Sequence, residues 1–445
     1  MENLHIAVVP VGRIHFDYDF GKELFHQFYQ RLEQQGYSLC GPQVPLTDLP
    51  AAEETAKLLK DQDPDALVVF YGTFADTQLL AALVNSLDLP VFLWAVPEQR
   101  TGGRLRLASF PGINLACHFL SLHGRPYRYA YAKLDDEEAW SGLSAFISAS
   151  GVARRLRSAR LGVVGERPAG METCDLDEAE IRQRLGATVE HIDLQAVFNG
   201  MLATDPTAVS ALRQRLNERL DNLENLDPKG LNLTLSAYLV MKDIAESKRL
   251  DGMAVRCWPE FFVNMGCSAC AALSMLSDDC VPATCEADAY GALSQFILQS
   301  LAEEPAFTTD IVEIDVQRNE IVFWHCGQAP LALADPDVRP RGVIHTNRKL
   351  PMLMDFPLKP GPVTLLRLSR AGGAFQLIAG KGEMLKAPKA YIGTSGVFRF
   401  ERTAQEFMDR ILSLGVEHHI SLAYGDFTET LEILSAMLQI PYVRL

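Results

Sequence analysis

The sequence lacks any apolar run that approaches the ~20 consecutive residues needed for a membrane-spanning helix. Its first residues, Met1-Glu2-Asn3-Leu4-His5, also lack the basic-then-apolar layout of a secretion signal. We therefore expect a cytoplasmic protein without a membrane partner.

Basic residues are scarce relative to acidic ones. The chain has 41 Lys and Arg against 56 Asp and Glu, which gives a formal net charge of −15 at pH 7. Because such a charge opposes binding to a phosphate backbone, the sequence predicts no nucleic-acid partner.

Cysteine does not follow the pattern of a secreted disulfide scaffold. Nine cysteines are scattered from Cys40 to Cys326, an odd number without close regular spacing, so we expect reduced thiols. One Cys-x-x-Cys, formed by Cys267 and Cys270, is typical of redox or zinc sites, but no second motif completes a zinc set. Small apolar residues surround it, and we interpret the segment as a helix packed in the core.

Three common motifs are missing as well. The sequence has no Gly-x-Gly-x-x-Gly dinucleotide pattern, no P-loop and no Gly-x-Ser-x-Gly elbow. A nucleotide cofactor and a serine hydrolase are therefore unsupported.

What the sequence does contain is an alternation of extended and helical patterns. An apolar run at 4–11 predicts a buried strand, and apolar residues at helical spacing predict a helix over 20–34. Runs at 66–71 and 91–95 predict two more strands, with a helix over 78–87 between them. Strands that are apolar on both faces and alternate with helices indicate a parallel sheet.

The chain of 445 residues is long enough for two or three domains. A new α/β pattern begins near residue 159 and includes a long helix predicted over 205–226, whereas short extended runs dominate after about residue 305. We therefore predict an α/β protein with two Rossmann-like α/β domains, at 1–158 and 159–304, followed by a strand-rich, β-barrel-like α+β domain at 305–445.

Three residues are candidates for the chemistry. Glu286 stands before a predicted helix that Asp288 is better placed to cap, so Glu286 has no evident structural task. Asp310 opens a predicted strand, where an acidic residue is usually a turn residue. His418 and His419 precede another strand, and the alternation of side chains predicts that only one of them can face a given site. Together, carboxylates and an imidazole suit a divalent metal such as Mn²⁺.

The contexts of these residues resemble the L-fucose isomerase family, within the L-fucose/L-arabinose isomerase superfamily. The segment from Thr284 to Ala292 resembles the family's glutamate-bearing strand end and following helix, and Asp310 stands 24 residues after Glu286, where the family has its metal-binding aspartate. The segments 418–426 and 434–441 resemble the family's C-terminal histidine, glycine and helix-Ile-Pro stretch. In that register, the metal histidine corresponds to His419.

The resemblance implies an enzyme, a metal-dependent aldose–ketose isomerase that acts through a cis-enediol or enediolate. Mn²⁺, or another divalent metal, would be held by Glu286, Asp310 and His419 and would stabilise the enediolate. Glu286 or Asp310 would move the proton between the two carbons, and the sequence does not decide which one starts. The resemblance also implies a homo-oligomer, a trimer or hexamer, with active sites near the subunit interfaces.

Four other residues are candidates for binding the sugar. Arg13 and Glu260 follow strands, where α/β proteins collect ligand groups, His325 ends a strand fifteen positions beyond Asp310, and His418 neighbours the metal histidine. Arg13 would bind oxygen atoms of the substrate, either within its own subunit or from a neighbouring one. An anionic substituent would require a basic pocket, for which the candidates are Arg13, Arg100, Arg104 and Arg348.

The substrate class stays open at this point, as do two other functions. The sugar could be a hexose, a 6-deoxyhexose, a 6-substituted hexose or a pentose. A metal-dependent lyase or epimerase would use the same ligands and the same first proton transfer. A non-catalytic sugar-binding protein would also have two α/β lobes, but it would not need the set of glutamate, aspartate and histidine.

Overall fold

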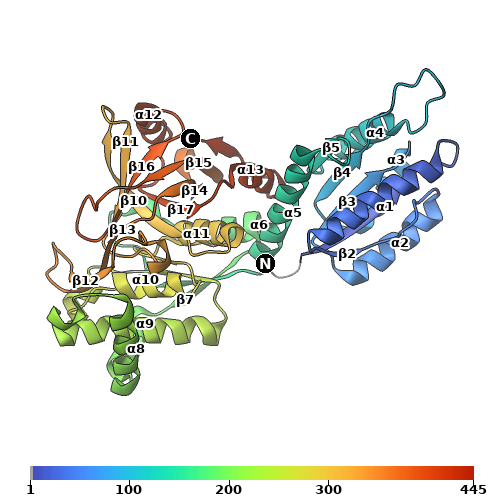
Figure 1. The fold of residues 1–445 in the computed structure, drawn as a ribbon. Coiled ribbons are helices and arrows are strands. Elements are labelled where there is room, and N and C mark those ends of the chain that lie inside the picture. Colours follow the sequence, from blue (N-terminus) through green and yellow to red (C-terminus); the bar gives the residue numbers. More distant parts are fainter. Residues whose placement is uncertain (1–3) are drawn as a thin grey trace. The chain divides into compact units, whose positions relative to one another are not determined.

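The computed structural model describes residues 4–445, which form two compact units (Figure 1). The N-terminal unit comprises the chain up to Arg154 together with Glu432–Gln439. The C-terminal unit comprises Arg155–Leu431 and Ile440–Leu445. Among the described residues, no helix is both long enough and apolar enough to cross a membrane.

The N-terminal unit is built on a five-stranded parallel sheet in the order β2-β1-β3-β4-β5. Its elements alternate along the chain as the sequence predicts: β1 (His5–Val11), α1 (Tyr18–Gln34), β2 (Ser38–Cys40), α2 (Leu49–Gln62), β3 (Ala66–Tyr71), α3 (Thr77–Ser86), β4 (Val91–Ala95), α4 (Ser109–Leu122), β5 (Tyr127–Tyr131) and α5 (Glu137–Ser158).

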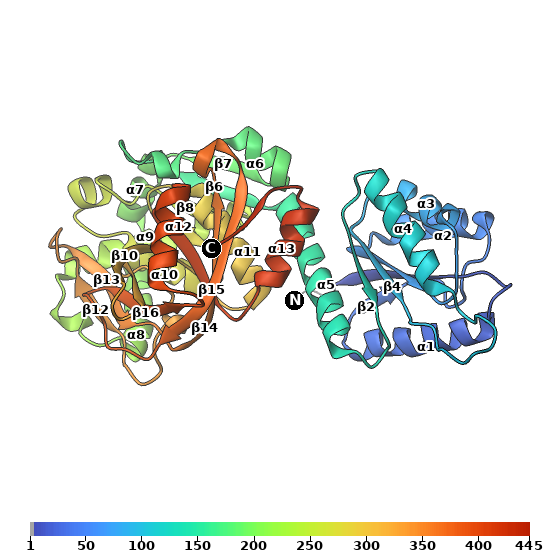
Figure 2. The ribbon, with the colours of Figure 1, turned by 90° about the horizontal axis from the view of Figure 1, so that it is seen from above.

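Both faces of this sheet are covered by helices, as the apolar central strands require (Figures 1 and 2). Every residue of β3 is buried. Apolar residues of α2, α3 and α4 form one core with the sheet. On the other face, the ring of Phe28 from α1 lies 5.2 Å from Trp94 and 5.0 Å from Trp140 of α5, measured between centroids. The parallel sheet predicted for this region is confirmed.

The C-terminal unit begins with a four-stranded parallel sheet in the order β7-β6-β8-β9. Its strands and helices are β6 (Arg160–Val164), α6 (Glu178–Leu185), β7 (Thr188–Ile192), α7 (Leu194–Ala203), α8 (Pro206–Arg219), α9 (Pro228–Lys248), β8 (Gly252–Val255), α10 (Cys270–Asp278), β9 (Ala283–Thr284) and α11 (Ala289–Ala302).

The single helix predicted over 205–226 is wrong in its extent, because α8 ends at Arg219. Leu220 is extended, and the backbone N–H of Asp221 donates to the carbonyl of Pro340 at 3.0 Å instead of continuing the helix. Asn222 then adopts the left-handed conformation, with φ 74°. A long-range backbone contact therefore overrides the local preference for helix.

The remaining strands form a nine-stranded mixed sheet in the order β12-β13-β16-β11-β10-β17-β14-β15-β18. A further pairing between β15 and β16 closes six of them, β16, β11, β10, β17, β14 and β15, into a ring. The elements of this region are β10 (Phe307–Asp315), β11 (Glu320–His325), β12 (Arg341–Ile344), β13 (Pro351–Pro357), β14 (Gly361–Ser369), β15 (Gln376–Leu385), β16 (Thr394–Phe400), α12 (Ala404–Leu414), β17 (His419–Tyr424), α13 (Thr428–Met437) and β18 (Tyr442–Arg444).

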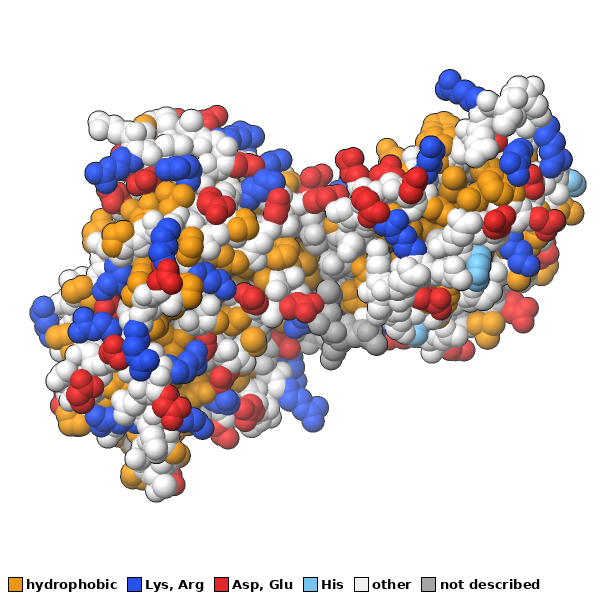
Figure 3. All heavy atoms as spheres, viewed as in Figure 1, with side chains coloured by type: hydrophobic (Ala, Val, Ile, Leu, Met, Phe, Trp, Pro, Cys, Tyr) orange, Lys and Arg blue, Asp and Glu red, His pale blue; other side chains and the backbone are white. Residues whose placement is uncertain are grey.

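Helix α11 connects the two sheets of the C-terminal unit, because it contacts β8 and β9 on one side and β14 and β17 on the other. Eleven of its residues are buried. The parallel sheets and the large strand-rich sheet confirm the predicted mixed α/β class, whereas the domain boundaries near 158 and 304 stay predictions. On the face shown in Figure 3, acidic and basic side chains are interspersed despite the net charge of −15.

Candidate active site

Asp310 and His419 are direct neighbours across two antiparallel strands. Asp310 of β10 pairs with His419 of β17, and its Oδ1 lies 3.5 Å from the Nε2 of His419. Asp310 is the fourth residue of β10, so the prediction that it opens the strand is wrong. Phe307, Thr308 and Thr309 before it already pair with β17, which extends the strand toward its N-terminus.

Glu286 reaches the same place from the turn between β9 and α11. Both Glu286 and Ala287 have left-handed backbone conformations, with φ 58° and 55°. The N–H of Ala287 donates to the carbonyl of Val255 at 3.1 Å, and that of Asp288 to the carbonyl of Cys285 at 3.0 Å. Left-handed residues other than glycine are costly and gather at functional sites. Here these two bonds hold the turn that directs the Glu286 carboxylate to the site.

The carboxylate of Glu286 is held at both oxygens. The indole Nε1–H of Trp258 donates to Oε1 at 2.9 Å, and the Nε2 of His418 lies 3.1 Å from Oε2. Burial alone would raise the pKa of this carboxyl group, but the hydrogen bond with His418, the neighbouring His419 and the bond from Trp258 together lower its pKa to about 2. Glu286 is therefore ionised at neutral pH.

His419 is oriented by a buried carboxylate. Its Nδ1 lies 2.9 Å from Oδ2 of Asp288, and both side chains are almost completely buried. Arg367 binds the same carboxylate through two N–H groups, at 2.6 and 3.0 Å. Asp288 also accepts from the N–H of Gly291 at 2.9 Å, which confirms that it caps α11. A Cβ atom at position 291 would collide with this carboxylate.

Both histidines of the pair face the site, so the prediction that only one could do so is wrong. His418 lies just before β17, where the alternation of a strand does not yet apply. Its Nε2 lies 4.0 Å from Oδ1 of Asp310, and the two imidazole rings are 4.0 Å apart between centroids. Thr173 contacts the other ring nitrogen of His418 at 2.9 Å.

His325 lies among thiols. Its Nε2 is 3.0 Å from the Sγ of Cys285, and its Nδ1 is 3.4 Å from the Sγ of Cys326. Burial lowers the pKa of His325 to about 4, so the imidazole is neutral at physiological pH. A neutral imidazole can donate at one nitrogen and accept at the other.

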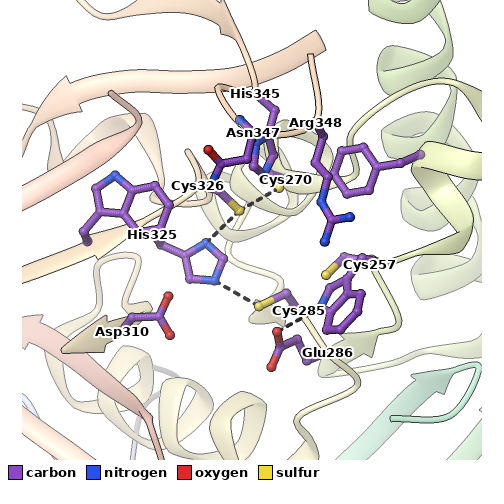
Figure 4. A pocket seen from close by; sticks show the side chains of 13 residues that line it. Cys257, Cys270, Cys285, Glu286, Asp310, His325, Cys326, His345, Asn347 and Arg348 are labelled. Atoms are coloured by element: carbon purple, nitrogen blue, oxygen red, sulfur yellow. Dashed lines mark hydrogen bonds between the residues drawn. The ribbon is translucent and has the colours of Figure 1, made fainter. Parts of the chain in front are cut away.

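Glu286, Asp310 and His325 line a cavity of about 460 Å³ in the C-terminal unit. In Figure 4, Glu286, Asp310 and His325 lie on one side of the opening and Arg348 extends toward it from another. The lining residues are Cys257, Trp258, Phe262, Cys270, Cys285, Glu286, Asp310, Trp324, His325, Cys326, His345, Asn347 and Arg348. A volume of this size can hold a monosaccharide.

The donor atoms are arranged so that they could hold a divalent metal ion. Ligand atoms of Cys174, Glu286, His418 and His419 all lie within 4.8 Å of one another, a group that includes Glu286 and His419 of the predicted metal ligands but not Asp310. Because Nδ1 of His419 is engaged with Asp288, its Nε2 is the nitrogen left to face the site, beside Asp310. A carboxylate that orients a histidine in this way is typical of metal centres. Burial lowers the pKa of His419, yet its bonds to Asp288 and Cys174 and the charge of Asp310 raise it well above the usual range, which shows that the surroundings favour a positive charge there.

Two of the predicted sugar-binding residues are absent from the lining of this cavity. Glu260 forms an ion pair with Arg256 at 2.7 Å and is absent from the lining of the cavity. Arg13 belongs to the N-terminal unit, where it pairs with Asp76 and donates to the carbonyl of Thr47 at 2.7 Å. Of the other arginines proposed for a basic pocket, Arg100 and Arg104 also belong to the N-terminal unit, and only Arg348 lines this cavity.

Several residues of the site were not predicted as functional from the sequence. Asp288 was interpreted as a helix cap, and its position two residues after Glu286 was the only signal of a second role. Trp258, Cys285 and Arg367 carry no motif, because their contacts with the site arise from distant segments.

Comparisons with known proteins identify the family of the chain. The model of the fucose/sulfoquinovose isomerase N-terminal domain matches residues 7–157, and that of the L-fucose isomerase C-terminal domain matches residues 355–445. A protein named sulfoquinovose isomerase from Priestia megaterium is 30% identical over 441 residues, which cover 99% of each chain. The chain belongs to the fucose/sulfoquinovose isomerase family.

Other relatives in this family carry the same name. The sulfoquinovose isomerases of Alkalicoccus urumqiensis and of a Clostridium species are 29% and 28% identical, and each alignment covers 99% of both chains. Membership in the fucose/sulfoquinovose isomerase family makes the chain an enzyme, an aldose–ketose isomerase, as the sequence predicts. A solute-binding protein from Agrobacterium vitis matches at 15% identity over 68% of this chain and 90% of its own, but its TM-score of 0.18 is too low to indicate a shared fold.

Proposed function

We propose that this isomerase converts a 6-sulfonated aldohexose, sulfoquinovose, into its ketose, with Mn²⁺ held by Glu286, Asp310 and His419. The observation that carries the proposal is one cavity that joins the two carboxylates to Arg348. The names of the relatives, which cover nearly the whole chain, support the same substrate.

Arg348 is suited to the sulfonate group. It is the only lysine or arginine among the residues that line the cavity. The carbon at the centre of its guanidinium lies 5.6 Å from the ring centroid of Trp258 and 5.4 Å from that of Phe262, so two aromatic side chains flank it. A guanidinium matches the oxygen geometry of a tetrahedral anion, and a sulfonate stays ionised at every physiological pH.

The bound metal would supply a positive charge that stabilises the enediolate formed from the sugar. The chain's own part is to position the groups that handle the proton. Asp288 fixes the ring of His419, and Trp258 and His418 fix the carboxylate of Glu286. His325, neutral and beside the carboxylates, can contact a sugar hydroxyl if it releases one of its thiol contacts.

Proton transfer between C1 and C2 is assigned to Glu286 and Asp310. One of these two carboxylates removes the proton from C2 of the aldose and, as the carboxylic acid that it has then become, returns the proton to C1 of the enediolate. Glu286, with its low pKa and two hydrogen-bonding partners, is held ionised. Asp310 has the more open carboxylate, with a quarter of its side chain exposed.

The test is conversion of sulfoquinovose, with L-fucose, D-arabinose and D-glucose as comparison sugars, by protein stripped with a chelator and resupplied with Mn²⁺. We expect ketose formation that depends on the metal and favours the sulfonated sugar. Glu286→Gln and Asp310→Asn should each lower kcat by about 100-fold or more, which is the usual contribution of a general acid or base. Glu313→Gln, an exposed change on β10, is the control and should retain activity.

Two outcomes would change the assignment. Metal-dependent turnover of an unsulfonated sugar in preference to sulfoquinovose would reject the sulfonated sugar as the substrate but would retain the assignment as an isomerase. Formation of an epimer or of cleavage products in place of the ketose would favour the epimerase or lyase, which uses the same carboxylates.

The assembly of the enzyme is a further part of this proposal. We infer a homo-oligomer, a trimer or hexamer, from the family resemblance. Light scattering coupled to size-exclusion chromatography would give the mass of the enzyme in solution. A monomer at the concentration of the assay would reject the proposed oligomer.

A further inference from the structure

Two cysteines in the wall of the catalytic cavity lie close enough to react with each other. The Sγ atoms of Cys270 and Cys326 are 3.0 Å apart (Figure 4). Cys270 is the first residue of α10, and Cys326 directly follows β11. The two segments are distant in the sequence, so no local motif marks the pair.

This pair differs from the Cys-x-x-Cys of the sequence, which we interpreted as core packing. Cys267 and Cys270 form the only Cys-x-x-Cys of the chain, but Cys267 is fully buried, its thiol interacts with Thr234, and it is absent from the lining of the cavity. Helix α10 begins only at Cys270, so the predicted helix does not include Cys267, although both residues are buried as core packing requires. The partner of Cys270 is therefore Cys326.

Cys270 and Cys326 both line the cavity of about 460 Å³, where Cys270 is buried and Cys326 is partly exposed, so a molecule as small as a peroxide that enters the cavity comes against them. They also differ in acidity. A hydrogen bond with Cys326 lowers the pKa of Cys270 despite burial, aided by Ser268 at the start of the helix. The same contact and burial raise the pKa of Cys326 well above its usual range. Cys270 is accordingly the thiol that ionises first.

We propose that Cys270 and Cys326 are a site of oxidative modification, at which hydrogen peroxide converts the two thiols into a reversible disulfide. The Cys270 thiolate attacks the peroxide, an S–O bond forms, the O–O bond breaks, and the leaving hydroxide takes a proton to become water. Cys326 then attacks the sulfenic sulfur, the S–S bond forms, the S–O bond breaks, and the hydroxide leaves as water with the proton of Cys326. Two thiols are oxidised and one peroxide is reduced.

Closure of this disulfide alters the catalytic cavity through His325. A disulfide requires the sulfur atoms at about 2.05 Å, so they must approach by roughly 1 Å. Cys326 now contacts Nδ1 of His325 at 3.4 Å, and oxidation removes its S–H and moves its sulfur toward α10. On its other side, His325 contacts Cys285, the residue before Glu286. The modification therefore disturbs a contact chain that ends at the proposed catalytic carboxylate.

The test treats full-length, reduced enzyme with hydrogen peroxide, followed by alkylation and peptide mapping. We expect a disulfide that joins the peptides of Cys270 and Cys326, with a loss of activity of about 10- to 100-fold, the scale of a 1 Å misplacement near an active site. Dithiothreitol should restore both the thiols and the activity. Cys270→Ser and Cys326→Ser should each form no such disulfide. After peroxide treatment, each variant should keep a larger fraction of its untreated activity than the unaltered chain does.

Cys267→Ser is the matched control, because it removes the other half of the motif and should respond to peroxide as the unaltered chain does. A disulfide between Cys267 and Cys270, or no disulfide at a dose that oxidises the exposed Cys280, would overturn the proposal. The same loss of activity in the Cys326→Ser variant would also overturn it. The activity measurement rests on the proposed isomerase function, whereas peptide mapping of the disulfide does not. Failure of the proposed function is therefore distinguishable from failure of the proposed disulfide.

Discussion

The Nδ1 of His419 lies 2.9 Å from Oδ2 of Asp288, and both residues are buried. Because Arg367 holds the far side of the same carboxylate, Asp288 cannot turn away from the histidine. The bond fixes the plane of the imidazole and leaves Nε2 as the nitrogen that can bind a metal.

Asp288→Asn should therefore weaken the binding of Mn²⁺ by about 10- to 100-fold, the usual effect of losing such an orienting carboxylate. Asparagine is also a good helix cap, so the start of α11 should be kept. Isothermal titration of the chelator-stripped protein would measure the affinity. Asp193→Asn is the control, because Asp193 caps α7 through the N–H of Gln195 and should not affect the metal. Unchanged affinity in both variants would contradict the orienting role.

Arg348→Gln should raise KM for sulfoquinovose far more than KM for a neutral sugar. A hydrogen bond to a charged group contributes roughly 1.5–3 kcal/mol, so the expected change in KM is about 10- to 150-fold. Steady-state kinetics with both sugars would measure it. Arg104→Gln, at an arginine outside the cavity with 70% of its side chain exposed, should change neither value. An equal rise for both sugars would mean that Arg348 shapes the cavity without selecting the sulfonate.

Trp258→Phe should lower kcat by about 10-fold and change KM less, because it keeps an aromatic ring but removes the N–H that donates to Glu286 at 2.9 Å. Trp324→Phe is a matched control. Its indole N–H also donates, to the carbonyl of Ile392 at 3.0 Å, and its ring also lines the cavity. Similar losses in the two variants would show that the position of Glu286 does not depend on Trp258.

Glu98 of the N-terminal unit provides a test based on pH. Its carboxylate accepts from the N–H groups of Leu107 at 2.7 Å and Ala108 at 3.0 Å, at the start of α4. Burial alone would raise the pKa of Glu98, but these bonds lower it. The stabilisation of the fold by the Glu98 carboxylate is therefore fully present above the ordinary carboxyl pKa, near 4.3. It is lost as the pH falls through the lowered pKa of Glu98 in the folded protein.

Hydrogen exchange of the Leu107 and Ala108 amides would measure this effect. After correction for intrinsic exchange rates, their protection should fall as the pH decreases below about 4. In Glu98→Gln, protection should be lower at neutral pH and should change little over the same range. A variant with the same protection and the same pH response as the unaltered chain would refute the role of Glu98.

Much of the N-terminal fold could be predicted because its signals are local. The strands at β1, β3 and β4 are continuous apolar runs, and the helices between them show regular apolar spacing. The candidate catalytic and metal-binding residues could be named because the contexts of Glu286 and His419 resemble those of a known family, not because their chemistry was visible in isolation. Asp310 alone would have been interpreted as a turn residue.

Other features of the site could not be predicted because they depend on long-range contacts. The approach of His418 depends on where β17 begins, and that start is set by its pairing with β10. The contact between Cys270 and Cys326 joins the start of α10 to the residue after β11, and the Cys-x-x-Cys motif gave no signal of it. Arg348 was one of four candidate arginines, and only the fold distinguished it from the others.

The pairing of Asp310 with His419 also has a consequence for how the protein refolds. A shift of one residue between β10 and β17 would turn one of the two side chains to the opposite face of the sheet. These strands are far apart in the sequence, and contacts of that kind form slowly during folding. Recovery of metal binding after dilution from denaturant should therefore lag behind recovery of helix, which would make the metal a reporter of correct strand register.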